Sequence, residues 1–176
     1  MNFRLLKVSP DIASLVSALE RQPEIWALDT FWKDHPIPIF REVDTIYLRF
    51  PDKEVFRSGV GDVNTCEDQK AISLLPESRE VIWAIFEHVR GKELGRVLIN
   101  RLPPCAKVLP HSDGENLYYS RYHVVLQTND LIEFRCGQEY ASMREGEVWW
   151  FDNSVEHEVI NHGDTPRIHL IVDIRT

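Results

Sequence analysis

The chain has 176 residues, of which 43% are hydrophobic and 27% charged, and its formal net charge is −8 at neutral pH. This length suits a single domain with a substantial core. The acidic balance argues against nucleic acid as a partner, because affinity for phosphate backbones depends on clustered Lys and Arg. No apolar run approaches the ~20 residues needed to span a bilayer, so we expect no membrane insertion.

The start of the chain and its cysteines predict a cytoplasmic protein. Residues 1–4 do not lead into the apolar core of a signal peptide. Three cysteines, at positions 66, 105 and 136, cannot all pair within one chain and show no C-x-x-C spacing, so we expect them to be reduced. The sequence leaves the oligomeric state open.

Two amphipathic helices are predicted in the first half. Ser9-Pro10 offers an N-cap and a first-turn proline, and a helical apolar face follows at Ile12, Leu15, Val16 and Leu19. A second helix should run from near Pro76 to Arg90, end at Gly91 and buttress one sheet. Its expected buried residues are Val81, Ile82, Ile85, Phe86 and Val89.

The segment between these helices, residues 27–62, is rich in aromatic residues and contains one strand-like run, Thr45–Phe50. Trp32 and His35 either form a small packed cluster or lie in a loop over an active-site mouth. Arg49 lies inside the strand-like run, where an unpaired cation would be costly to bury. We therefore expect it to meet a carboxylate, of the protein or of a substrate.

The second half is predicted to be mainly β. Aromatic and β-branched residues fill three runs, separated by turn-forming residues that are typical of hairpins. The runs are Tyr119–Gln127, Leu131–Cys136 and Glu147–Phe151.

His111-Ser112-Asp113 and the distant His157 form a candidate metal site. Side chains at i and i+2 of an extended segment point to the same face, so His111 and Asp113 can bind one ion. A third ligand must come from a neighbouring strand, and His157 is favoured over His162, which would point away from the shared face. Two imidazoles and one carboxylate are the facial triad of non-haem Fe(II) oxygenases.

Arg167 follows the second metal histidine on the next predicted strand. Its guanidinium is a planar fork of donors that suits the distal carboxylate of a dicarboxylic cosubstrate such as 2-oxoglutarate. His169 shares a strand face with Arg167 and either lines the pocket or packs in the core. Asn100 could also lie near the cosubstrate.

Residues 100–174 resemble the aspartyl/asparaginyl beta-hydroxylase family, and the F-D-x-S-x-E-H-E-V pattern is specific. The resemblance is carried by Leu109–Gly114, Ser120–His123, Gly146–Val159, Arg167 and Ile171–Asp173. It implies a double-stranded β-helix of the jelly-roll, cupin-like type. It also implies that His111 and His157 bind the iron, that Arg167 pairs with 2-oxoglutarate, and that Arg121 and His123 help to hold this cosubstrate.

The activity implied by the resemblance is that of an Fe(II)- and 2-oxoglutarate-dependent dioxygenase. Such an enzyme uses O2 to hydroxylate an unactivated C–H bond of an amino acid or peptide residue, and it releases succinate and CO2. A free amino acid or small peptide is slightly favoured, because the chain is short and has no protein-docking repeat. Animal members of the family carry glycine where this chain has Asp113, so the complete triad is a departure from their pattern.

Together these features predict one mainly β domain with flanking helices. Residues 1–92 would be a helical and irregular scaffold with substrate-specificity elements, and residues 93–176 the double-stranded β-helix catalytic core. Two alternatives stay open. One is a cupin-like hydrolase or isomerase that uses Zn²⁺ or Mn²⁺ without 2-oxoglutarate, and the other is a noncatalytic metal- or 2-oxoglutarate-binding protein.

Overall fold

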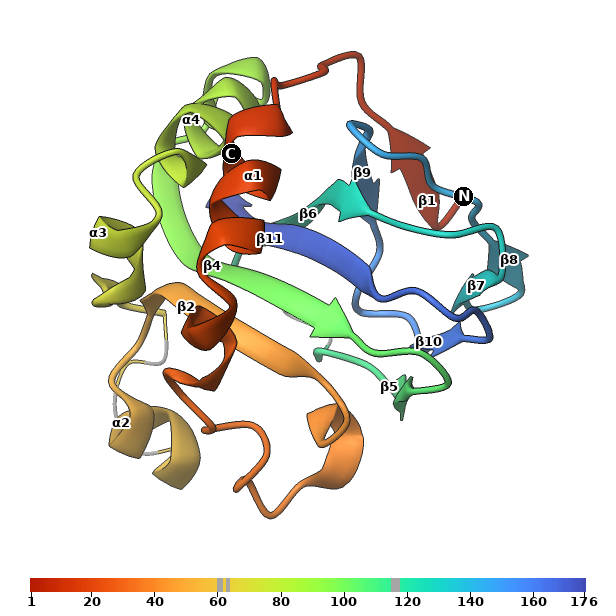
Figure 1. Cartoon of the computed structure of the whole chain (residues 1–176), viewed down its shortest axis with the longest axis horizontal. Coiled ribbons are helices and arrows are strands. Elements are labelled where there is room, and N and C mark those ends of the chain that lie inside the picture. Colours follow the sequence, from red (N-terminus) through yellow and green to blue (C-terminus); the bar gives the residue numbers. More distant parts are fainter. Residues whose placement is uncertain (60–61, 63, 115–117) are drawn as a thin grey trace.

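Two antiparallel sheets form the body of the molecule (Figure 1). The computed structural model describes residues 1–59, 62, 64–114 and 118–176. The large sheet has the order β1 (Phe3–Leu5), β9 (Val148–Phe151), β6 (Ser120–Gln127), β11 (Arg167–Arg175), β4 (Glu93–Leu102), β2 (Asp44–Phe50) and β3 (Glu67–Asp68). The small sheet has the order β5 (Lys107–His111), β10 (His157–Asn161), β7 (Ile132–Cys136) and β8 (Glu139–Tyr140). This is the predicted double-stranded β-helix.

The three strands predicted for the second half are present as β6, β7 and β9, each with its first residue one position later than expected. The sheets also draw on the first half of the chain. β1 pairs with β9 through Phe3 and Phe151, and β2 pairs with β4 through Ile46 and Ile99. Residues 1–92 therefore supply strands as well as helices and loops.

The predicted helices cover the outer face of the large sheet, where α1 (Ala13–Arg21) and α4 (Ser78–His88) are visible in Figure 1. Between α1 and α4 in the sequence lie the short helices α2 (Lys53–Ser58) and α3 (Ala71–Leu74), and the 3₁₀ turns η1 (Pro23–Ala27) and η2 (Pro38–Phe40). One buried cluster joins the helices to the sheet, with Leu15 and Ile85 against Ile99, Val124 and Val172. Burying these apolar surfaces supplies much of the driving force for folding.

The expected start of α1 at Ser9 is wrong. The helix begins at Ala13, and the Asp11 side chain accepts the Ala13 N–H at 3.0 Å. A carboxylate near a helix N-terminus satisfies one of the free backbone donors there, as the serine was expected to do.

Gly91 lies just after α4, close to where the helix was predicted to end. Glycine is needed there because of close packing, and not because of a left-handed backbone conformation. The left-handed residue is Arg90, with φ 57°, and the Gly91 N–H donates to the Phe86 carbonyl at 2.8 Å. A Cβ at position 91 would lie 2.6 Å from the Phe86 ring and 2.8 Å from Ile174. Glycine is therefore needed because the helix end packs against β11.

We expect Gly91→Ala to lower the free energy of unfolding by about 1–3 kcal/mol, because overpacking forces neighbouring side chains and backbone to shift. Urea denaturation of the metal-free protein measures the change. Lys92→Ala, in the same turn but exposed, should have little effect. Equal stability of the two variants would contradict this explanation of the glycine.

Within the described ranges, none of the helices combines the length and apolar character needed to cross a membrane. Cys66 and Cys136 are buried, Cys105 is exposed, and all three are free thiols, as expected.

Candidate metal centre

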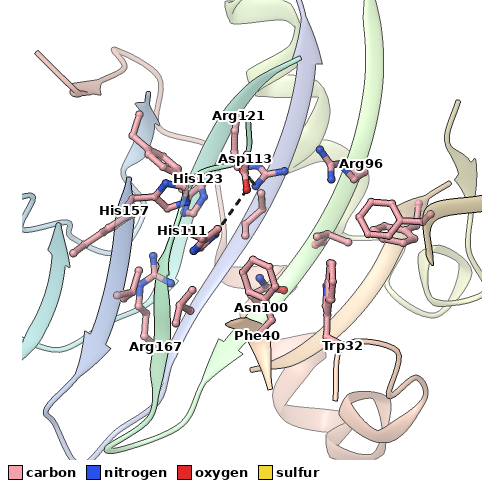
Figure 2. A pocket seen from close by; sticks show the side chains of 18 residues that line it. Trp32, Phe40, Arg96, Asn100, His111, Asp113, Arg121, His123, His157 and Arg167 are labelled. Atoms are coloured by element: carbon pink, nitrogen blue, oxygen red, sulfur yellow. Dashed lines mark hydrogen bonds and ion pairs between the residues drawn. The ribbon is translucent and has the colours of Figure 1, made fainter. Parts of the chain in front are cut away.

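The structure brings together the three residues predicted to bind a metal. His111 ends β5 and His157 begins β10, and these two residues face each other in the strand register. Asp113 follows two residues after His111. One ligand atom from each side chain can be chosen so that all lie within 4.8 Å of one another. Figure 2 shows the three side chains directed into one pocket.

Both histidines are oriented by backbone carbonyls. His111 Nδ1 lies 2.7 Å from the Leu109 oxygen, and His157 Nδ1 lies 2.9 Å from the Val155 oxygen. A carbonyl only accepts, so each Nδ1 carries the hydrogen and each Nε2 keeps its lone pair for a metal. Burial, followed by the charge of His111, lowers the pKa of His157 to about 4. His157 is therefore neutral near pH 7, as a metal ligand must be.

Asp113 is held in its ionised form. Burial opposes ionisation, but the positive charge of Arg121 and a hydrogen bond from Asn153 lower its pKa to about 2. Asn153 Nδ2 donates to Asp113 Oδ2 at 2.7 Å, and Arg121 Nη1 donates to the same oxygen. The other oxygen, Oδ1, lies 3.7 Å from His111 Nε2. This leaves Oδ1 as the oxygen that faces the metal position.

Arg121 is bound on two sides by carboxylates. Besides Asp113, it donates from Nε and Nη2 to the two oxygens of Asp173, at 2.8 and 2.9 Å. Asp173 is buried and also accepts from Arg96 Nε at 3.0 Å. These contacts orient Asp113, and the predicted role of Arg121 in holding the cosubstrate stays a prediction.

Arg167 is a buried cation with no carboxylate partner. It is 4% exposed, and burial lowers its pKa to about 9. Among the described residues, no Asp or Glu lies within ion-pair distance of its guanidinium, which instead contacts His169 Nδ1 at 3.0 Å and the face of Phe134. Burying such a charge is costly unless an anion compensates it. The arrangement therefore fits an anionic ligand.

His123 and His169 lie beside Arg167 in the interior. Their Nδ1 atoms are 3.2 Å apart, and the Nε2 atom of each is buried without a hydrogen-bond partner. His123 lines the same pocket as the metal triad. His162, in contrast, is exposed and lies 3.6 Å from Glu133, which agrees with the choice of His157 as the metal ligand.

A cavity of about 230 Å³ lies between the two sheets. It is lined by the three candidate metal ligands and by Arg121, His123 and Arg167. Asn100 lines it as expected, and so does Trp32, whereas His35 is buried against Trp32 and Phe31. Arg49 lies elsewhere, and its carboxylate partner is Asp68 of the protein, at 2.8 Å. Sequence reasoning missed three residues of the site, Arg96, Asn153 and Asp173.

The buried histidines predict a pH-dependent stability. Burial, reinforced by the charge of Arg167, lowers the pKa of His123 and His169 well below 6.5. Below pH 6.5 the unfolded chain then binds more protons than the folded chain, so stability falls as pH falls. Each histidine can contribute up to about 1.4 kcal/mol per pH unit.

Urea denaturation of the metal-free protein between pH 7.5 and 5 measures this slope. His169→Asn should make the slope shallower, whereas the exposed His162→Asn should not change it. Asp113 and Asp173, with lowered pKa values, titrate below this range. Identical slopes in the two variants would contradict the assignment.

Comparison with known proteins places this chain in a family. The family model for aspartyl/asparaginyl beta-hydroxylases matches residues 54–176, which is more of the chain than the motifs alone indicated. L-Proline cis-4-hydroxylase of Rhizobium meliloti (strain 1021) is 34% identical over 103 residues, covering 56% of this chain and 35% of the relative. Ornithine lipid ester-linked acyl 2-hydroxylase of Rhizobium tropici is 29% identical over 163 residues, covering 84% and 56%.

The mouse aspartyl/asparaginyl beta-hydroxylase is 28% identical over 89 residues, covering 51% of this chain and 12% of the mouse protein. The chain thus spans only part of these relatives. Among solved structures, an oxidoreductase of the 2OG-Fe(II) oxygenase family from Burkholderia pseudomallei has a TM-score of 0.56 at 14% identity, covering 98% of this chain and 92% of that one. That likeness shows a common fold. The match over residues 54–176 shows that the chain belongs to the aspartyl/asparaginyl beta-hydroxylase family.

Proposed function

We propose that the protein is an Fe(II)- and 2-oxoglutarate-dependent dioxygenase that hydroxylates a free amino acid or a small peptide. One observation carries the proposal. The ligand atoms of His111, Asp113 and His157 lie within 4.8 Å of one another, and they share a pocket with the buried, carboxylate-free Arg167.

The residues present fit Fe(II). Two neutral imidazoles and one ionised carboxylate form the donor set of non-haem Fe(II) oxygenases, and such a set leaves further coordination positions for other ligands. The carbonyls behind both histidines, and the two donors on Asp113 Oδ2, fix these side chains before any metal binds. Outer partners of this kind raise metal affinity in known metalloproteins.

The residues present also fit 2-oxoglutarate. Arg167 offers a charged fork of donors to one carboxylate in the pocket. Its charge is costly to bury alone, so the far carboxylate of a dicarboxylate would compensate it.

When bound, Fe(II) and 2-oxoglutarate supply, with O2, the oxidising power for C–H hydroxylation, with release of succinate and CO2. The chain's own residues bind the cosubstrate and orient the metal ligands. Arg167 binds the distal carboxylate, and Arg121 and Asn153 keep Asp113 ionised and aligned. Phe40 and Phe151, whose rings lie 5.0 and 4.9 Å from the rings of the two metal histidines, exclude water.

Relatives of two kinds bear on the substrate. Two carry the names L-proline cis-4-hydroxylase and L-proline cis-3-hydroxylase 1, which point to an amino acid, whereas a third is an acyl hydroxylase of ornithine lipid, which points to a lipid. A cavity of about 230 Å³ is smaller than the roughly 300–1,000 Å³ of typical drug-sized sites. The two proline hydroxylases and the small cavity favour a free amino acid or short peptide. The free thiols agree with a reducing compartment such as the cytoplasm.

Substrate-stimulated succinate release tests the proposal. The Fe(II)-loaded protein is incubated with 2-oxoglutarate, O2 and a panel of free amino acids and short peptides. We expect at least one compound to increase succinate formation and to gain one oxygen atom. Metal-dependent turnover of a substrate without consumption of 2-oxoglutarate would instead favour the cupin-like hydrolase or isomerase.

A further inference from the structure

Arg96 lies in the pocket, although the cosubstrate and the metal do not account for it. It belongs to β4, where it shares a face with Leu98 and Asn100, and all three side chains line the cavity. Its one hydrogen bond among the described residues runs from Nε to Asp173, so the two terminal nitrogens keep their donors. In Figure 2 these nitrogens point to the side of the pocket that holds Asp113.

Arg96 and Arg167 occupy opposite ends of the pocket, with His111 and Asp113 between them (Figure 2). Asp173, the partner of Arg96, is six residues beyond Arg167 on β11, or about 20 Å along the strand. A five-carbon dicarboxylate spans only about 6 Å, given C–C bonds of about 1.5 Å. A cosubstrate that meets Arg167 with its far carboxylate and the triad with its 2-oxo acid end stops short of Arg96, which lies beyond the triad, and leaves Arg96 for a second molecule.

The charges of the pocket favour a second molecule that carries a carboxylate. Among the described residues, the pocket and its ion-pair network contain three arginines and two aspartates, Arg96, Arg121, Arg167, Asp113 and Asp173. The count leaves one net positive charge. A divalent metal and a dianionic cosubstrate add no net charge, so the excess remains when both are bound. A free amino acid is a zwitterion and leaves this net charge unchanged, but its carboxylate would lie beside Arg96, at the positive end of the pocket, and electrostatic complementarity of this kind contributes to ligand selection.

Next to Arg96 the pocket wall is aromatic. The Arg96 guanidinium lies 5.9 Å from the centre of the Phe56 ring, and Phe56 packs against Phe50 and Trp32 at 5.0 and 5.6 Å. Trp32 in turn contacts Phe40, which packs against the metal ligand His111. An apolar body bound along these rings would extend from Arg96 towards the metal.

On these grounds, and resting on the proposed function, we propose that Arg96 binds the carboxylate of the molecule that is hydroxylated, and that this molecule is a free amino acid with an apolar side chain. A residue inside a peptide has no α-carboxylate to offer. The aromatic wall would contact the side chain of the substrate, and the small cavity limits the substrate to a single residue.

Anaerobic calorimetry on the protein loaded with Fe(II) and 2-oxoglutarate tests this without turnover. The probes are proline, valine, leucine, isoleucine, methionine and phenylalanine, each compared with its carboxamide, which has nearly the same shape but an uncharged amide in place of the carboxylate. We expect at least one free amino acid to bind wild type about 10- to 100-fold more tightly than its amide. In Arg96→Gln this preference should fall below about threefold, and Arg96→Lys should show an intermediate value.

Arg101→Gln is the matched control, because Arg101 is on the same strand but pairs with Asp44 outside the pocket. It should keep the wild-type preference. An undiminished preference in Arg96→Gln, or the absence of any preference for a free acid in wild type, would overturn the proposal. Binding of 2-oxoglutarate is measured first in each variant, and failure there would count against the proposed function and not against Arg96.

Discussion

Replacing His111 or His157 with alanine should abolish Fe(II) binding. In the proposed site each side chain supplies one of three protein ligands found among the described residues, and its Nε2 is already positioned by a backbone carbonyl. Loss of an outer partner alone typically lowers metal affinity by about 10- to 100-fold, so loss of a direct ligand should exceed about 100-fold. Anaerobic equilibrium dialysis against Fe(II) measures the affinity.

His162→Ala is the control for a histidine outside the site, because this exposed residue lies beside Glu133. It should bind Fe(II) like wild type. If His162→Ala removed the metal while His157→Ala kept it, the ligand assignment would be wrong. Circular dichroism of each variant separates loss of a ligand from loss of the fold.

Arg167→Ala should leave Fe(II) binding unchanged and weaken 2-oxoglutarate binding by about 30-fold to several thousand-fold. This range corresponds to about 2–5 kcal/mol, the usual cost of removing one partner of a buried, hydrogen-bonded charge pair. Anaerobic titration with 2-oxoglutarate gives the affinity. The concentration needed for half-maximal succinate production should rise in parallel.

Arg167→Lys should restore binding only in part, because an ammonium keeps the charge but lacks the planar fork. Arg121→Ala and His123→Ala should show smaller shifts in 2-oxoglutarate affinity than Arg167→Ala. Wild-type affinity for 2-oxoglutarate in Arg167→Ala would exclude this residue as the carboxylate-binding group and would weaken the proposed function as a whole.

Local pattern was enough to predict the strands that lie between the two candidate metal histidines in the sequence. Turn residues marked off β6, β7 and β9, and alternation of side chains placed His111 and Asp113 on one face. The pairing of His157 with His111 depends on which strands are neighbours. The sequence pattern showed only that a third ligand must come from a neighbouring strand. The resemblance to a known family made His157 the specific candidate.

The network around Asp113 was not predicted, because it depends on the register of distant strands. Arg121 faces Asp173 across β6 and β11, and Asn153 reaches Asp113 from the loop after β9. One signal was present in the sequence. Asp173 interrupts an apolar run, and a carboxylate buried there requires cationic partners, which are Arg121 and Arg96.

The start of α1 and the end of α4 show two ways in which local sequence rules fail. The rule gave the wrong position for the start of α1, and it gave nearly the right position for the end of α4 but for the wrong reason. Gly91 lies just beyond α4, but it is required by close packing against Phe86 and Ile174. Ser9 looked like the N-cap of α1, yet the helix starts at Ala13, beside the Asp11 carboxylate. The first outcome depends on tertiary packing, which a local pattern does not contain, and the second depends on a local contact of another residue.

By the family resemblance, animal members carry glycine in place of Asp113, so this residue is a departure that bears on metal binding. Here the carboxylate is largely buried, has a lowered pKa and accepts hydrogen bonds from Arg121 and Asn153 through Oδ2. Those contacts leave Oδ1 facing the candidate metal position, so we expect Asp113 to contribute to Fe(II) binding in this protein.

Anaerobic titration of the Fe(II)-loaded protein with 2-oxoglutarate, followed by visible absorption, tests the central claim most directly. A 2-oxo acid that chelates Fe(II) through its keto and carboxylate oxygens produces a charge-transfer band, which neither component gives alone. We predict that the band appears in wild type and saturates at one equivalent of 2-oxoglutarate. Fe(II) binding without any such band would contradict the account, because the metal and Arg167 would then not serve one ligand.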